Sequence, residues 1–266
     1  MSSRALKARG DPVDGGDISG LLRFARNDNH GDMQERRKKV LKAVVKEYQK
    51  TGEPVSSQWL AQRWHFGFSP ATVRAEMLVL DREGFLEQPH TSAGRLPTDK
   101  AFRFFIEEFG EEELSQNEQE QVLNQLRKFH DDSMKDMAQL LADCSRGLGL
   151  SGVFGRTADF HGAGLGWLAE EPEFKDADLK NIMKCFDSLE EDFNKFFGDM
   201  DEETEIYIGR ENPIKYLRNY SLVITGFDND GERGVLGILG PKRMDYRKNK
   251  FVLEETRKRV SKQVTK

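Results

Sequence analysis

The first third of the chain shows short amphipathic segments separated by polar turns. In residues 34–50 apolar side chains recur at helical spacing after a run of four basic residues. Gly52 and Pro54 end this segment, as glycine and proline commonly do after a last helical turn. A second, shorter helix is predicted over residues 57–64, and residues 65–68 form a turn.

The clearest helix start in the chain follows this turn. Ser69 is a favoured N-cap residue, and Pro70 suits the first helical position. The helix runs to Gly84. Its predicted inner stripe consists of Val73, Met77 and Leu80. One face of this helix is therefore expected to pack on its own domain, which leaves the other face outward.

A strand, a loop and a further helix are predicted next. Residues 85–88 have the pattern of a strand, residues 89–97 form a polar loop with a glycine, and Thr98 caps a helix. This order of elements is typical of a winged helix-turn-helix. We expect such a domain over residues 33–109, after an unstructured tail over residues 1–32. Met33 is an alternative start of translation.

The remaining residues, 110–266, predict a mixed α+β domain. An amphipathic pattern over residues 114–141 predicts one long linking helix. Strand patterns occupy residues 205–208, 221–225 and 235–239, with a hairpin connection at residues 228–234. Helical patterns occupy residues 175–197 and 249–262. The fold class expected for the whole chain is therefore α+β.

Charge is distributed unevenly along the chain. The formal net charge is -5, with 41 Lys and Arg against 46 Asp and Glu. Basic residues outnumber acidic ones between residues 33 and 105, whereas acidic residues dominate from 106 to 150. A basic module attached to an acidic body fits a domain that binds phosphates, and chance clustering on solvated surfaces is the alternative.

Other classes of protein have little support in the sequence. The chain has no apolar run long enough to span a membrane and no secretory signal, and it has two lone cysteines, Cys144 and Cys185. These features predict a cytoplasmic protein. His90, His130 and His161 lack partners at metal-ligand spacing, and no nucleotide-binding fingerprint occurs. We therefore expect no enzyme, catalytic residue, metal or cofactor.

Candidate DNA contacts follow from the outward face of the helix that begins at Pro70. An arginine such as Arg74 can pair with guanine O6 and N7, and the methyl group of Thr72 or of an alanine can contact thymine. The free amides at the helix start suit a phosphate. The candidate residues of this helix and its cap are Ser69, Ala71, Thr72, Arg74 and Ala75.

The loop and the first helix supply further candidates. The tip of the predicted wing is small and polar, and Gly94 is expected to permit a tight turn. Arg95 could lie along a phosphate or enter a narrow minor groove. The loop candidates are His90, Thr91, Ser92 and Arg95, and the candidates for backbone contacts are Lys38, Lys39 and Lys42. Simple solvation of the three lysines is the alternative.

Long segments of the chain resemble the HrcA family, the heat-inducible transcription repressors. The N-terminal segments that carry the resemblance are ERRKKVLKAVVKEYQKTGEPVSSQWLA and SPATVRAEMLVLDREGFLEQPHTSAGRLPTDKAFRFF. The C-terminal segments are IYIGRENPIKYLRNYSLVITGF and GVLGILGPKRMDY, and a weaker match is GAGLGWLAEEPEF.

The resemblance implies a dimeric repressor that binds an inverted-repeat operator upstream of chaperone operons. It also implies a GAF-like body and a GroE-type chaperonin that maintains the active form. The family's operator contacts correspond here to Thr72, Arg74, Ala75 and Arg95.

The chain departs from the family pattern in three places. It is shorter than family members: only SGVFGRTADFH stands where they have extra strands of the GAF-like sheet. The helical dimerisation insert is absent or reduced between Phe174 and Glu205, which puts the usual dimer interface and any ligand pocket in doubt. Ala75 stands where the family often has asparagine, so operator preference is expected to differ.

Two further readings of the sequence stay open. The winged helix could be a protein-interaction module that does not bind DNA, although the basic charge and Arg74 favour DNA. The protein could also regulate other genes in response to a small ligand of the GAF-like body.

Overall fold

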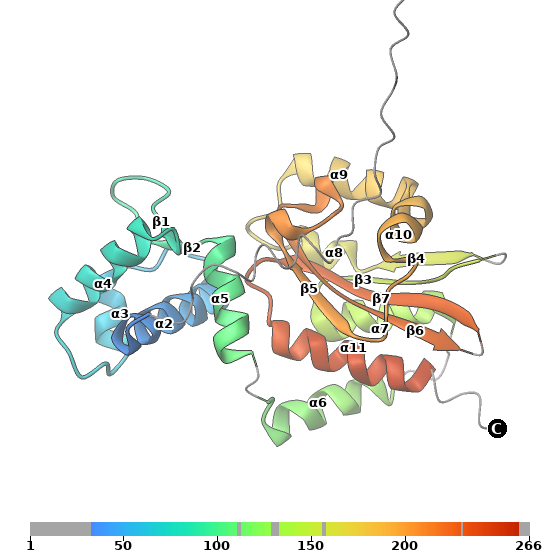
Figure 1. The fold of residues 1–266 in the computed structure, drawn as a ribbon, viewed down its shortest axis with the longest axis horizontal. Helices are drawn as coiled ribbons and strands as arrows, with labels where there is room; N and C mark the ends of the chain where they lie inside the picture. Colours follow the sequence, from blue (N-terminus) through green and yellow to red (C-terminus); the bar gives the residue numbers. More distant parts are fainter. Residues whose placement is uncertain (1–32, 111–112, 129–132, 156–157, 230, 261–266) are drawn as a thin grey trace, which may run out of the picture. The chain divides into compact units, whose positions relative to one another are not determined.

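The computed structural model describes residues 33–110, 113–128, 133–155, 158–229 and 231–260 (Figure 1). The predicted tail over residues 1–32 lies outside these residues. A compact unit begins at Glu35, and all the elements below belong to it. Mixed helices and an antiparallel sheet confirm the α+β class. Among the described residues, no helix is both long and apolar enough to cross a membrane.

The first three helices form where the hydrophobic pattern predicts them. They are α2 (Glu35–Thr51), α3 (Ser57–Arg63) and α4 (Pro70–Arg82). Serine side chains cap the second and third: Ser56 Oγ accepts from Trp59 N at 3.1 Å, and Ser69 Oγ accepts from Thr72 N at 3.2 Å. The buried side chains that join the three helices include Val40, Val44, Leu60, Val73 and Leu80.

A small hairpin and a fourth helix follow. Strand β1 (Leu86–Glu87) pairs antiparallel with β2 (Leu96–Pro97), and α5 (Asp99–Phe109) begins after Thr98, whose hydroxyl accepts from Ala101 N at 3.3 Å. The sequence predicted the first strand and the cap, but it placed residues 96 and 97 in a loop. We call residues 35–109 the head.

The predicted long helix over residues 114–141 is wrong. The structure has two helices there, α6 (Gln116–Leu126) and α7 (Met134–Ser145). Ser115 caps the first in a capping box with Glu118, and Ser133 Oγ accepts from Asp136 N at 3.2 Å to cap the second. Each helix buries one apolar stripe, so the hydrophobic period alone does not mark the interruption.

The rest of the chain, which we call the body (residues 114–260), is built on one five-stranded antiparallel sheet. The order is β4-β3-β7-β6-β5. The strands are β3 (Leu148–Val153), β4 (Asp159–Ala163), β5 (Thr204–Ile208), β6 (Tyr220–Asn229) and β7 (Glu232–Pro241). The last three and their hairpin were predicted, although β6 and β7 extend further. β3 and β4 were not predicted.

Helices cover both faces of this sheet. Helix α7 and α11 (Tyr246–Val260) lie on one face, and α9 (Asp176–Asp187) and α10 (Leu189–Phe197) lie on the other, where Phe193 contacts Phe160 of β4 (Figure 1). A short helix, α8 (Leu165–Ala169), follows β4. The helical stretch predicted over residues 175–197 is confirmed as two helices, and α11 confirms the stretch predicted from residue 249 as far as Val260.

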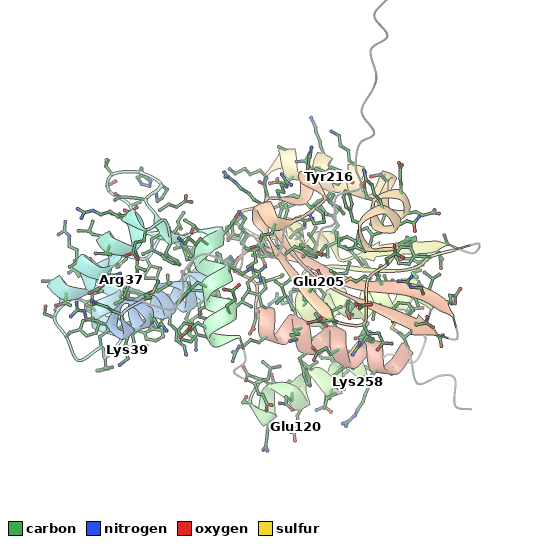
Figure 2. The ribbon with its side chains drawn as sticks, in the orientation of Figure 1. Arg37, Lys39, Glu120, Glu205, Tyr216 and Lys258 are labelled. Carbon is green, nitrogen blue, oxygen red and sulfur yellow. The ribbon has the colours of Figure 1, made fainter. Side chains whose placement is uncertain are left out.

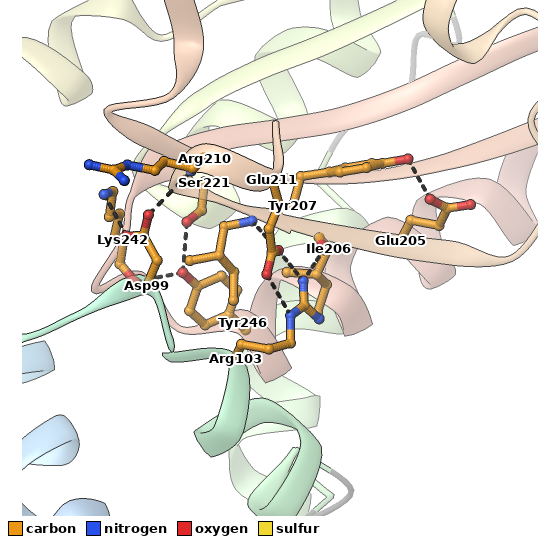
Figure 3. Close-up of polar contacts among 11 residues, drawn as sticks. Asp99, Arg103, Glu205, Ile206, Tyr207, Arg210, Glu211, Ser221, Lys242 and Tyr246 are labelled. Atoms are coloured by element: carbon orange, nitrogen blue, oxygen red, sulfur yellow. Dashed lines mark hydrogen bonds and ion pairs between the residues drawn. The ribbon is translucent and has the colours of Figure 1, made fainter. Parts of the chain in front are cut away.

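Helix α5 of the head also contacts the body through ion pairs (Figure 3). Arg103 donates to both carboxylate oxygens of Glu211, and the bond from its Nε to Glu211 Oε1 is 3.0 Å long. It also donates to the Ile206 carbonyl at 2.6 Å. Asp99 lies 2.5 Å from Lys242 Nζ. Glu211 ends the short 3-10 helix η2 (Gly209–Glu211), and a second one, η3 (Lys215–Leu217), follows. The head therefore contacts β5, η2 and the residue after β7 through directional contacts.

Candidate nucleic-acid interface

Helix α4 has one buried and one exposed face. Val73, Met77 and Leu80 are buried, which confirms the predicted inner stripe. The opposite side chains are exposed, and Leu78 retains 42% of its surface in solvent. The exposed side chains, which we call the outer face of α4, are Ala71, Arg74, Ala75 and Leu78.

At the start of α4, two of the predicted DNA-contact residues bond to each other. The hydroxyl groups of Ser69 and Thr72 lie 2.9 Å apart, and Ser69 Oγ also accepts from the Thr72 amide. Thr72 is half-buried, whereas Ser69 is exposed. The two hydroxyl groups therefore form a cap, and Arg74, two residues after Thr72, is the cation of the outer face.

The acidic side chains of α4 and of its C-cap are engaged in ion pairs. Glu76 is bound by arginines of α2, and Glu83 lies 2.7 Å from Arg37. Asp81 lies 2.8 Å from Arg95. Arg74 forms no ion pair with any residue that the structure describes. The outer face of α4 is consequently cationic.

The hairpin loop lies beside the outer face of α4. His90, Thr91 and Ser92 are exposed, and the Gln88 amide shapes the loop by donating to the carbonyls of Thr91 at 3.0 Å and Ala93 at 2.9 Å. A hollow of about 350 Å³ separates loop and helix. Its lining includes Arg74, Leu78, Thr91, Ser92 and Arg95. The structure thus brings Arg74 of the helix together with Thr91, Ser92 and Arg95 of the loop, whereas the other helix candidates and His90 do not line the hollow.

Arg95 lies at the base of the hairpin rather than at its tip. Its backbone exchanges two 2.9 Å hydrogen bonds with Val55, and its side chain, 14% exposed, rests against Asp81. The turn of the loop lies just before Gly94, where Ala93 N donates to the His90 carbonyl at 2.9 Å, and Gly94 is not among the described residues with positive φ. A Cβ on Gly94 would lie 2.5 Å from the Val55 carbonyl carbon, so the glycine permits close backbone contact.

The three lysines of α2 differ in their surroundings. Lys39 is exposed, as Figure 2 shows. Lys38 Nζ lies 2.6 Å from Glu108, and this hydrogen bond raises the pKa of the lysine. Lys42 Nζ lies 4.3 Å from the centroid of the Phe109 ring. Lys38 and Lys42 are therefore directed to the end of α5, and Lys39 is the most accessible of the three.

Sequence reasoning missed two features of this surface. Glu76 is a buried carboxylate on α4, and its signal was a charged residue at a position that the helical period places inside. Trp59 of α3 is 38% exposed and carries Arg63 at 5.4 Å over its ring. The second feature has no sequence signal, because an aromatic residue on an amphipathic helix is normally expected in the core.

Comparison with known families identifies the chain's relatives. A family model described as the HrcA protein C terminal domain matches residues 97–249, which is more than half of the chain. The chain belongs to the HrcA family. The resemblance noted from the sequence is confirmed, and HrcA proteins are transcription repressors rather than enzymes.

Individual HrcA proteins match a part of the chain at higher identity and most of the chain at lower identity. A heat-inducible transcription repressor HrcA of Natranaerobius thermophilus is 46% identical over 107 residues, which is 40% of this chain and 31% of that protein. The HrcA of Caldanaerobacter subterraneus subsp. tengcongensis is 25% identical over 318 residues, which is 81% of this chain and 92% of that protein. The match to the Natranaerobius protein thus spans about a third of that protein's length. This chain is shorter than the full-length HrcA proteins.

A solved structure shares the fold. A hypothetical protein known from a crystal structure at 2.2 Å resolution aligns with a TM-score of 0.66 at 19% identity, covering 86% of this chain and 98% of that chain. At this identity the match concerns the fold alone. It spans the head and the body together.

Proposed function

We propose that this HrcA protein is a sequence-specific DNA-binding repressor that acts in the cytoplasm. In this proposal residues 33–109 form a winged helix-turn-helix, with α3 and α4 as the two helices of the motif and the β1–β2 hairpin as the wing. The observation that carries the proposal is the outer face of α4, which is exposed, cationic and free of unpaired carboxylates.

The contacts follow from the geometry of the outer face. Arg74 reads a guanine in the major groove, and Ala71 or Ala75 packs on a thymine methyl group. The exposed loop residues Thr91 and Ser92 lie across the hollow from Arg74, and together with the exposed His90 they contact the sugar-phosphate backbone. Lys39 and Ser69 supply further phosphate contacts, and Arg95 reaches the backbone only after leaving Asp81.

The body is proposed as a shortened GAF-like domain for regulation and dimerisation. Its support is the five-stranded antiparallel sheet with helices on both faces. One recognition helix covers only half of an operator, so an inverted repeat requires two protomers. The relatives are named heat-inducible transcription repressors, and in line with the family resemblance we propose chaperone operons as targets and a GroE-type chaperonin as the partner that maintains activity.

The test of this function is selection of bound fragments from the genome of the source organism with the purified protein. We expect an inverted repeat to be enriched, and we expect affinity for it to fall steeply with salt because phosphate contacts release counterions. A protein-interaction module would enrich no sequence. Enrichment of a repeat away from chaperone genes would leave DNA reading intact and contradict the heat-shock assignment.

A further inference from the structure

A carboxylate lies buried in the middle of α4. Glu76 is 3% exposed and belongs to the same inner face as Val73 and Leu80. A buried charge is costly unless it is paired and hydrogen-bonded. A side chain of this kind in an otherwise apolar stripe therefore needs a specific partner.

Two consecutive arginines at the start of α2 bind this carboxylate. Arg36 Nε donates to Glu76 Oε1 at 2.7 Å, and Arg37 Nε donates to Glu76 Oε2 at 3.1 Å. Arg37 also lies 2.7 Å from Glu83, which caps the C-terminal end of α4. Helix α4 is consequently held to the start of α2 at two points along its length.

These contacts constrain rotation of α4 about its own axis. Arg74 and Glu76 are two positions apart, so they point about 200° apart around the helix. Any rotation that moves the Glu76 carboxylate from its arginines also moves Arg74 on the outer face. The apolar contacts of Val73, Met77 and Leu80 are non-directional, whereas two hydrogen bonds to separate oxygens fix an angle.

We propose that Glu76, seated between Arg36 and Arg37, is a positioning residue that sets the angle at which Arg74 meets a base. This inference rests on the proposed function. Glu76 touches no DNA in this account and acts through the orientation of α4. A buried ion pair commonly adds little net stability over an apolar pair of similar size, so its directional effect is the more important one here.

The test compares Glu76→Gln with Glu83→Gln. Both variants remove a carboxylate that contacts Arg37, but only Glu76→Gln removes the buried carboxylate in the middle of α4. The probes are a duplex selected by the wild-type protein from a random pool and a scrambled duplex of the same length. The ratio of the two affinities is measured by fluorescence anisotropy well below the melting temperature of each variant.

We expect Glu76→Gln to lower this ratio about tenfold, comparable to the loss of one good base contact, and Glu83→Gln to change it less than about twofold. Binding to the scrambled duplex should stay unchanged, because phosphate contacts do not need an exact helix angle. An unchanged ratio for Glu76→Gln, or an equal loss on both duplexes, would overturn the inference.

Two further variants separate positioning from stability. Replacement of the whole cluster by apolar residues of similar length (Arg36→Met, Arg37→Met and Glu76→Met together) leaves none of its charges buried, so we expect this variant to retain the melting temperature while losing the affinity ratio; retention of both would overturn the inference. If neither variant folds, Arg36→Gln gives the same comparison, because the Arg36 side chain is 50% exposed. Failure of the wild-type protein to prefer any duplex would instead contradict the proposed function itself.

Discussion

Arg74 is the residue on which base reading depends most. It is exposed, unpaired among the described residues, and located in the N-terminal half of α4. We predict that Arg74→Ala weakens binding to the selected duplex by about 1–3 kcal/mol and leaves binding to a scrambled duplex nearly unchanged. Arg82→Ala, at the C-terminal end of α4, is the matched control. Equal losses on both duplexes would argue against base reading by Arg74.

Cys144 is a second residue whose behaviour follows from its surroundings. Burial raises the pKa of its thiol to about 11, so the reactive thiolate is scarce at pH 8. In a Cys185→Ser protein we predict that a thiol reagent labels Cys144 only after unfolding by urea. Labelling of the native protein as fast as the unfolded one would show that the site is open.

For individual residues, the sequence predicted which positions face inward, but it did not predict the ion-pair partners of the long charged side chains. Val73, Met77 and Leu80 follow directly from the helical period. Lys38 meets Glu108 only when α2 and α5 come together. Arg95 meets Asp81 only when the hairpin and α4 come together. No local pattern contains that information.

Among the elements, α5 links the head to the body. Arg103 and Glu211 are each 19% exposed at the side chain, so removal of one partner leaves a largely buried charge. We predict that Arg103→Ala lowers the free energy of unfolding by about 3 kcal/mol, measured by urea denaturation. Lys258→Ala, which breaks an exposed pair with Glu255, is the control, with an expected change below about 0.5 kcal/mol. Similar effects of both variants would contradict this picture.

Strand β3 was missed by sequence reasoning for a physical reason. Strand β3 is buried on both faces and contains glycines, so it shows neither alternation nor high strand propensity. A Cβ on Gly149 would lie 2.1 Å from the Ala138 carbonyl oxygen of α7, and one on Gly152 would meet the Phe160 ring. Tertiary packing requires these glycines. By contrast, the break between α6 and α7 had a readable signal in the cap of Ser133 with Asp136.

For the whole molecule, the proposed operator symmetry requires two protomers. We predict that light scattering detects two chains on a duplex that carries the full inverted repeat. The sheet order β4-β3-β7-β6-β5 was not predictable, because β3 and β4 had no strand pattern and the long connection to β5 carries only helices. A complex of one chain with the full repeat would contradict dimeric binding.

Shielding of α4 by DNA tests the central claim most directly. In the Cys185→Ser background, Ala75→Cys places a thiol on the outer face of α4, and Glu120→Cys places one on the exposed surface of α6 (Figure 2). The rate of maleimide labelling is measured with and without the selected duplex. We predict that DNA slows labelling at position 75 about tenfold or more and leaves position 120 unaffected, as expected for a helix inserted in the major groove. Equal rates at position 75 with and without bound duplex would contradict the account.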